Sequence, residues 1–191
     1  MSAGETAHVT GHEGVYLAKD WLEKTGRVKA AWTVYEQPEQ LKVPIPSALE
    51  RSFDLGGLID GGDLNGHEFY AEIKHVNSVG SQPNQYSEYL ANCYCMVAHD
   101  PGRLRQFFWV TWHPFSQTDW TNLTSVEMVS REVERHKSEW HNTGFTVDQE
   151  ICTKVSHSLW IIVLSKKQES LVMSDEMYAE VMKQLTLGRA R

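Results

Sequence analysis

Two apolar segments separated by a short glycine-rich stretch constrain this chain more than any other feature of its sequence. The segments FDLGGLI (53–59) and EFYAEIKHV (68–76) have the length and residue types of β-strands. The stretch DGGDLNG (60–66) between them has the composition of a turn. Together they predict an antiparallel hairpin, in which each residue of one strand lies opposite a residue of the other.

The register of this hairpin is expected to bring three charged side chains together. With the turn centred at Asp63, Asp54 and Glu72 are equally far along the chain from that centre and face each other. Side chains alternate along a strand, so Lys74 shares a face with Glu72 while Ile73 points to the other face. Asp54, Glu72 and Lys74 are therefore predicted to converge on one small patch.

The predicted patch has the ligand chemistry of a magnesium site. Two carboxylates a few ångströms apart repel each other unless a cation lies between them, and Mg²⁺ or Mn²⁺ prefers oxygen ligands. A bound Mg²⁺ lowers the pKa of a coordinated water and neutralises charge on a phosphate, and a nearby lysine can orient that water or balance the charge. Asp54, Glu72 and Lys74 therefore predict metal-assisted hydrolysis of a phosphodiester.

A different interpretation is that these charges form the solvated face of an ordinary half-buried strand. Carboxylates at strand spacing occur in that setting in many acidic proteins. Here the two charges of the second strand lie among Tyr70, Ala71, Ile73 and Val76. That composition is too apolar for a surface strand, so we expect the charged residues to lie in a mostly buried sheet.

In the order of its elements the chain resembles the PD-(D/E)XK (restriction-endonuclease-like) nuclease superfamily, whose motif is an aspartate on one strand and Glu-x-Lys on the next. The resemblance implies an α/β fold with an α-β-β-β-α-β core, in which a central mixed sheet is flanked by helices. The matching first helix, second helix and following strand are GHEGVYLAKDWLEKTG (11–26), QYSEYLANCYCMVAH (85–99) and RQFFWVTWHPF (105–115). Phe53, rather than the proline of the family's motif, precedes Asp54.

The resemblance also implies the ligands of the metal. Asp54 and Glu72 would hold it, and the carbonyl oxygen of Ile73 would be a further ligand. The first helix of the family often donates a glutamate, and Glu13 is the candidate here. Glu13 fits equally well as an acid in the first turn of a helix, where it interacts favourably with the helix dipole.

A further implied feature is the pair Gln85 and Tyr89, which lie four residues apart on one helical face. The pair matches the Gln-x-x-x-Tyr motif of the RecB-type branch of the superfamily, where both residues lie beside the metal site and contact the nucleic acid. Gln85 therefore joins Asp54, Glu72 and Lys74 as a catalytic candidate, and Gln85 and Tyr89 are the substrate-binding candidates. Tyr89 also fits a position in the core.

The number of cysteines bears on which branch of the superfamily the chain resembles. Cys93, Cys95 and Cys152 are the only three in the chain, and a cubane iron–sulfur cluster needs about four thiolates. This count argues against the cluster-bearing exonucleases. Cys93 and Cys95 also lack the spacing of zinc ligands, so we expect both to be buried or partly buried thiols.

Length and composition predict a single domain over residues 1–191, with a nuclease-like core over about 11–115 and a C-terminal extension over about 116–191. The extension is expected to add a helix, a strand and a second helix, at 121–140, 158–165 and 174–185. No secretory leader or apolar run of about 20 residues is evident, so we expect a cytoplasmic protein without membrane contact.

The net charge of −7 opposes tight nucleic-acid binding by this chain alone. We therefore expect a second copy, in a homodimer, or a recognition partner protein to assist. The predicted function is a Mg²⁺-dependent deoxyribonuclease, acting as an endonuclease or exonuclease on DNA in restriction, defence against mobile DNA or repair. The alternative is a catalytically inactive nuclease-like subunit or scaffold within a larger nucleic-acid-processing complex.

Overall fold

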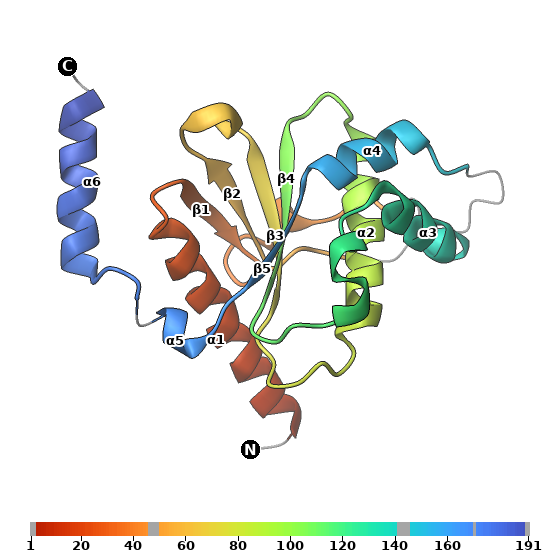
Figure 1. Cartoon of the computed structure of the whole chain (residues 1–191), viewed down its shortest axis with the longest axis horizontal. Coiled ribbons are helices and arrows are strands. Elements are labelled where there is room, and N and C mark those ends of the chain that lie inside the picture. Colours follow the sequence, from red (N-terminus) through yellow and green to blue (C-terminus); the bar gives the residue numbers. More distant parts are fainter. Residues whose placement is uncertain (1–2, 46–49, 141–145, 170, 190–191) are drawn as a thin grey trace.

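A five-stranded mixed sheet forms the centre of the molecule (Figure 1). The structure is a computed structural model and describes residues 3–45, 50–140, 146–169 and 171–189. The strands are β1 (Val28–Thr33), β2 (Leu55–Ile59), β3 (Glu68–Lys74), β4 (Arg105–Thr111) and β5 (Leu159–Val163). They lie side by side in chain order, antiparallel from β1 to β3 and parallel from β3 to β5.

Helices cover both faces of the sheet. They are α1 (Ala3–Glu23), α2 (Gln82–His99), α3 (Val126–His136), α4 (Gln149–His157), α5 (Lys166–Glu169) and α6 (Asp175–Arg189). Helix α1 packs on one face, while α2, α3 and α4 pack together on the other. Helix α6 stands apart from the sheet (Figure 1). The expected α/β class is confirmed, and the elements up to β4 follow one another as α-β-β-β-α-β.

Strand β3 separates two apolar cores, as the alternation of its side chains predicts. Phe69, Ala71 and Ile73 pack towards α1, whereas Tyr70 packs towards α2. Strand β4 is buried at every position, which is expected for a central parallel strand covered on both faces. Strand β4 is therefore an inner strand, and β1 and β5 form the two edges of the sheet.

The predicted hairpin forms, and its register is the predicted one. Leu55 pairs with Ala71 and Leu58 with Glu68, which places the centre of the turn at Asp63. Gly57 allows β1 to approach closely, because a Cβ atom at this position would lie 2.0 Å from the carbonyl oxygen of Lys29. The glycines of β2 therefore serve the packing of the first two strands.

Three of the expected boundaries of the first two helices were wrong. Helix α1 begins at Ala3, eight residues before the expected start, and ends at Glu23. The chain then turns at Gly26, whose φ of 70° lies in the left-handed region that favours glycine. Helix α2 begins at Gln82, three residues early, because Pro83 lies in its first turn, where a missing N–H group costs no hydrogen bond.

The C-terminal extension is more broken than expected. The predicted helix over 121–140 is α-helical only from Val126 to His136, with 3₁₀ turns on either side. Ser125 sets its start, since the hydroxyl accepts a hydrogen bond from the Met128 N–H at 3.1 Å. Helix α4 (Gln149–His157) was not predicted, whereas β5 and α6 occupy the expected segments.

Candidate functional site

The three predicted charged residues meet at the carboxyl end of β3. Asp54 immediately precedes β2, and Glu72 and Lys74 belong to the last three residues of β3. Asp54 interacts electrostatically with both of them. Because β3 and β4 run parallel with a helical crossover between them, this end of the strands is where open α/β sheets place their ligands.

The backbone and side chain of Asp54 are both fixed by neighbouring strands. Its N–H donates to the Ala71 carbonyl at 3.0 Å, and its own carbonyl accepts from Val34 at 2.9 Å. Carboxylate oxygen Oδ2 accepts a hydrogen bond from the Ile73 N–H at 2.7 Å. Among the described residues no hydrogen bond to Oδ1 is formed, so one carboxylate oxygen is held by the sheet and the other can accept a ligand.

Glu72 and Lys74 form a partly buried ion pair. The Lys74 Nζ lies 2.7 Å from Glu72 Oε1, and each side chain is 18% exposed. The ammonium group also lies 5.7 Å from the centre of the Trp109 ring, within the range of a cation–π interaction. Lys74 is therefore held between a carboxylate and an aromatic face.

Burial and the neighbouring charges shift the pKa values of the site. Burial, and next the negative charge of Glu72, raise the pKa of Asp54 from its ordinary value of 3.8 to about 7. The charge of Lys74 and the Ile73 N–H oppose this shift without cancelling it. For Lys74, burial favours the neutral amine, but Glu72 and Asp54 outweigh it and raise the pKa. Lys74 is thus a permanent cation near neutral pH.

The donor set of the site fits a hard divalent cation. When Asp54 is ionised, two carboxylates and one ammonium leave the patch with one net negative charge. The N–H and C=O groups of one strand residue point to the same side, so the Ile73 carbonyl lies on the side from which its N–H reaches Asp54. Two carboxylates and a carbonyl are the oxygen ligands that Mg²⁺ or Mn²⁺ takes.

Glu13 does not join this set in the structure. Its side chain is exposed on α1, and within the described ranges no three His, Cys, Asp or Glu side chains gather into a group that could hold a metal ion. Gly14, the next residue, is buried against the opposite face of β3, where its Cα hydrogen faces the Cβ of His75. The close approach of α1 at Gly14 is the feature that places this helix beside the site.

Gln85 and Tyr89 lie on α2, the helix that covers the site-bearing face. Gln85 is half-buried, whereas Tyr89 is 1% exposed and packs against Phe53 and Trp109. The Tyr89 hydroxyl is buried beside the Cys93 thiol, a weak hydrogen-bonding group, and has no stronger partner among the described residues. Burial raises its pKa. The predicted substrate contact of Tyr89 stays a prediction, and the ring belongs to the core.

Two of the buried polar atoms that lack a hydrogen bond lie near the site, and a third lies at the other end of β3. Three buried side-chain nitrogen or oxygen atoms lack a hydrogen bond in the described part of the chain: Tyr89 Oη, Trp109 Nε1 and Arg105 Nε. Trp109 lies under Lys74 and pairs with Glu72 in the strand register, and Glu72 acts on the pKa of Tyr89. Orphaned polar groups of this kind are rare in folded proteins and need a functional or structural reason.

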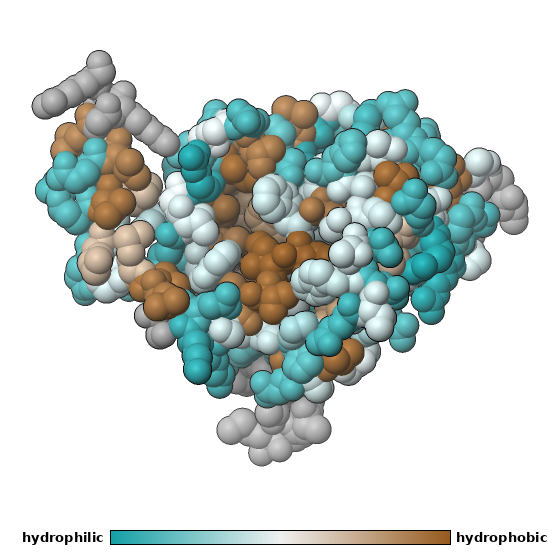
Figure 2. Space-filling model, viewed as in Figure 1, coloured by the Kyte–Doolittle hydropathy of each residue, from teal (hydrophilic) through white to brown (hydrophobic). Residues whose placement is uncertain are grey.

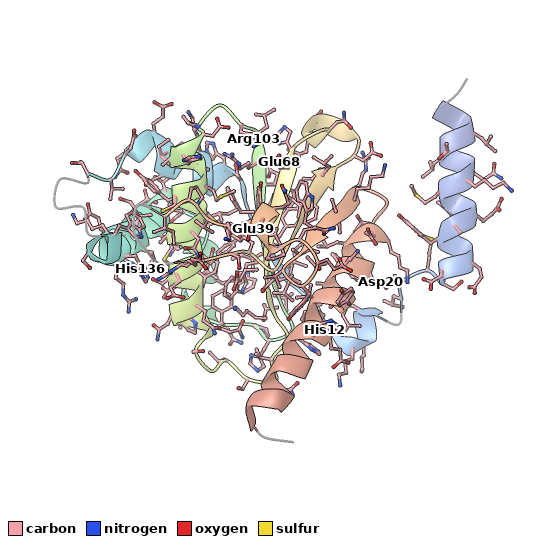
Figure 3. The ribbon with its side chains drawn as sticks, turned by 180° about the vertical axis from the view of Figure 1, so that it is seen from behind. His12, Asp20, Glu39, Glu68, Arg103 and His136 are labelled. Carbon is pink, nitrogen blue, oxygen red and sulfur yellow. The ribbon has the colours of Figure 1, made fainter. Side chains whose placement is uncertain are left out.

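An aromatic rim that the sequence did not indicate borders Asp54. The ring of His12 lies 4.8 Å from that of Tyr16 and 4.6 Å from that of Tyr35. Burial, and then the charge of Asp54, raise the pKa of Tyr35. The other end of β3 is closed by an ion pair between Glu68 and Arg103, at 2.9 Å, far from His12 (Figure 3).

A second buried polar cluster joins α2 to α3. The Ser87 hydroxyl donates to Glu132 Oε2 at 2.5 Å and lies 2.8 Å from His136 Nε2. Arg131 and Arg135 flank the carboxylate, and together with Ser87 they lower its pKa although burial opposes this. Because the serine bridges the acid and the imidazole, the order of contacts differs from that of a hydrolase triad, and the cluster tethers two helices.

The expectation that Cys93 and Cys95 are buried or partly buried thiols is confirmed. Cys93, Cys95 and Cys152 are all buried free thiols. His75 lies on the face of β3 opposite Lys74, where its ring contacts Trp112 at 4.7 Å. Of these residues, Cys93 lies beside the Tyr89 hydroxyl and is reached by the charge of Glu72.

In comparisons with known proteins, no family model, curated protein or solved structure matches the chain. In the described part of the chain, no helix has the length and apolar character needed to cross a membrane. The resemblance to the PD-(D/E)XK superfamily therefore stays a prediction made from the motif residues.

Proposed function

We propose that this protein is a metal-dependent nuclease that hydrolyses phosphodiester bonds of DNA. The observation that carries the proposal is the arrangement of Asp54 beside the Glu72–Lys74 pair at the carboxyl end of β3. A carboxyl group with a pKa raised to about 7 costs stability in the metal-free protein, and such costs concentrate at functional sites. A bound cation would remove that cost.

The metal would be held by oxygen atoms that the hairpin has already positioned. Asp54 Oδ1, the Glu72 carboxylate and the Ile73 carbonyl are the ligands in this proposal. Bound Mg²⁺ or Mn²⁺ supplies charge that acidifies a water and neutralises a phosphate. Glu13 would take part only if α1 or the glutamate side chain rearranged, since it stands apart from the pair.

Lys74 is assigned the role of a fixed positive charge. Its raised pKa keeps the amine protonated, so it cannot take a proton from water near neutral pH. A protonated ammonium can instead donate hydrogen bonds to a phosphate oxygen as negative charge builds there during attack. The contacts with Glu72 and the Trp109 ring hold the group in place for this purpose.

The substrate side of the site faces α2 and the loop before it. Gln85, which is half-buried at this end of α2, is the residue assigned to contact the nucleic-acid strand. Restriction, defence against mobile DNA and repair are the settings proposed for the activity. A net charge of −7 gives weak affinity for DNA, so assistance from a second copy or a recognition protein is part of the proposal.

Cleavage assays with matched variants test the proposal. Purified protein is incubated with linear and circular DNA, single- and double-stranded, and with RNA, in Mg²⁺, Mn²⁺ or EDTA. Asp54→Asn and Lys74→Met should each lower metal-dependent cleavage by about 100-fold or more. The controls Asp63→Asn and Lys29→Met change exposed residues of the same types in the same sheet region and should cleave like wild type.

Two outcomes would contradict the proposal. Equal cleavage by wild type, Asp54→Asn and Lys74→Met would place the activity at another centre. Absence of cleavage under every condition, combined with DNA binding that EDTA does not change, would instead favour the inactive nuclease-like subunit. Cleavage of closed circles would identify an endonuclease, and a requirement for ends would identify an exonuclease.

A further inference from the structure

The face of the sheet that α1 covers is left partly open at β4 and β5. A groove of about 500 Å³ lies between the C-terminal end of α1, the turn after β2, and strand β5. Its lining is mostly apolar and includes Trp21, Leu22, Ile59, Phe108, Trp160 and Ile162. Figure 2 shows apolar residues gathered over the centre of this face. The groove has the size and character of a site for a row of apolar side chains.

Strand β5, which borders the groove, is an exposed edge. Its sequence LWIIV is entirely apolar, yet none of these five described residues is buried, and Trp160 is 46% exposed. An apolar edge strand attracts other polypeptide segments, and folded proteins ordinarily cover or charge such strands. The groove and β5 together form an exposed apolar surface, of the kind that another polypeptide segment ordinarily covers in folded proteins.

Helix α6 has the complementary surface. Met177, Val181 and Leu185 recur every four residues, so they lie on one side of the helix, and they are 59%, 41% and 48% exposed. Tyr178 and Met182 border this stripe. Figure 1 shows the helix standing apart from the body, and Figure 2 shows apolar residues along it. An amphipathic helix with such a stripe is stable mainly when the stripe is packed.

Within its own chain, α6 starts beside the groove but does not enter it. Asp175 in its first turn forms an ion pair with Lys24 Nζ at 2.9 Å. The preceding residues 171–173 line a small cavity with Trp21, which also borders the groove. The first turn of α6 is thereby attached to the end of α1, and the rest of the helix extends away from the sheet (Figure 1).

We propose that two copies of this chain exchange their α6 helices, so that the apolar stripe of each fills the groove of the other. Each chain carries both the apolar stripe and the groove that would receive it. In a dimer related by a two-fold axis, each stripe fills the groove of the other copy, so no stripe or groove is left for a third copy. Stable interfaces bury about 1,600 Å² in total, and reciprocal exchange doubles the area that one 15-residue helix can bury.

Charge complements this fit. The first half of α6 carries exposed Glu176 and Glu180, and the groove is lined by one exposed cation, Arg27, and one exposed carboxylate, Asp63. No described carboxylate forms an ion pair with Arg27 within the chain. An incoming α6 that placed one of its acids against Arg27 would add an ion pair to the contact of its apolar stripe.

The exchange leaves the candidate nuclease site open. The groove lies on the α1 face and near the start of β4 and β5, whereas Asp54, Glu72 and Lys74 lie at the carboxyl end of β3. The dimer therefore does not depend on the proposed nuclease function, and either can fail without the other.

Light scattering coupled to size-exclusion chromatography tests the dimer with the full chain. Wild type should have twice the chain mass of 21.8 kDa at micromolar concentration. Val181→Glu with Leu185→Glu, on the stripe, should give the monomer mass. Ala179→Glu with Thr186→Glu adds the same charge to the exposed polar side of α6 and should leave the dimer intact. Circular dichroism melting shows that each variant is folded.

A mixing experiment separates exchange between copies from packing of α6 on its own body. The stripe variant has an intact groove, and a Trp160→Glu variant has an intact stripe. Each variant alone should be monomeric. In an equimolar mixture, the stripe of the Trp160→Glu variant can fill the groove of the stripe variant, so a dimer with one intact contact should form. A wild type that is monomeric at all concentrations would overturn the proposal. So would a stripe variant that stays dimeric, or a mixture that remains monomeric.

Discussion

Replacing Asp54 by asparagine should stabilise the metal-free protein, although it abolishes the proposed activity. Asparagine keeps the size of the side chain and retains an oxygen that can accept the Ile73 N–H, which now bonds Oδ2 at 2.7 Å. The substitution removes only the negative charge. That charge is unfavourable in the folded protein, because burial and the neighbouring Glu72 raise the pKa of Asp54 to about 7.

The size and pH range of this stabilisation follow from the difference between the pKa of Asp54 in the folded protein and in the unfolded chain. In the unfolded chain Asp54 ionises near its ordinary value of 3.8, and in the folded protein near 7. Between these values the folded state binds more protons than the unfolded state, so the free energy of unfolding falls as pH rises from about 4 to about 7. Three pKa units correspond to about 4 kcal/mol, which is the upper bound for the gain in Asp54→Asn above pH 7.

Urea unfolding in EDTA at a series of pH values measures this gain. The difference between Asp54→Asn and wild type should be near zero at pH 4, grow through pH 5.5, and level off above pH 7. Asp63→Asn, an exposed change in the same hairpin, should follow the wild-type curve. Parallel curves for wild type and Asp54→Asn would refute the reasoning, because they would show that Asp54 titrates normally in the folded protein.

Magnesium provides the complementary measurement. A ligand that binds only the folded state stabilises it by about 2.7 kcal/mol at a hundred times its Kd. Added Mg²⁺ should therefore raise the melting temperature of wild type, and the rise should be largest above pH 7, where Asp54 is ionised. Asp54→Asn should show little or no rise. An equal rise in both proteins would place the metal elsewhere.

Three further predictions concern other parts of the molecule. Gly14→Ala should destabilise the protein by about 1–3 kcal/mol, since its Cβ would lie 2.3 Å from that of His75; a melting temperature equal to wild type would show that α1 is free to move. Ser87→Ala leaves buried Glu132 without one hydrogen bond and should cost about 1–3 kcal/mol in urea unfolding, whereas Ser130→Ala, on the same helix pair, should cost less. Lys74→Arg keeps the charge but not the compact ammonium, and should retain DNA binding while cleavage falls about 10-fold or more; unchanged cleavage would assign Lys74 a purely structural role.

The hairpin could be predicted to the residue because its determinants are local. Alternating side chains, two runs of strand length and a glycine-rich turn fix which residues face each other, and the observed pairing of Leu55 with Ala71 follows that register. The meeting of Asp54 with Glu72 and Lys74 follows from the same register. No information from distant parts of the chain is needed for this part of the site.

The surroundings of the site depend on contacts between distant segments, and these were not predictable from local pattern. The rim of His12 and Tyr35 joins α1 to the segment after β1, and nothing in either segment indicates the other. Trp109 lies under Lys74 only because β4 pairs with β3 in one particular parallel register. The exposed stripe of α6 is visible in the sequence as a helical pattern, but the pattern does not say whether the stripe is covered.

The distribution of unfavourable groups favours a working site over a scaffold. Away from the site, buried polar groups such as Ser87 and Glu132 have partners whose contacts stabilise the fold. Arg105, whose Nε lacks a hydrogen bond, still donates through Nη1 to two carbonyl groups. Around Lys74, by contrast, a carboxyl group with a raised pKa and two unpaired buried atoms, on Tyr89 and Trp109, lie close together. A site whose only task were to hold strands together would be more stable with an apolar or amide side chain in place of Asp54. A bound cation would neutralise the unfavourable charge of Asp54 in the folded protein. The free energy of unfolding of Asp54→Asn, compared with that of wild type with and without Mg²⁺, measures this unfavourable contribution directly.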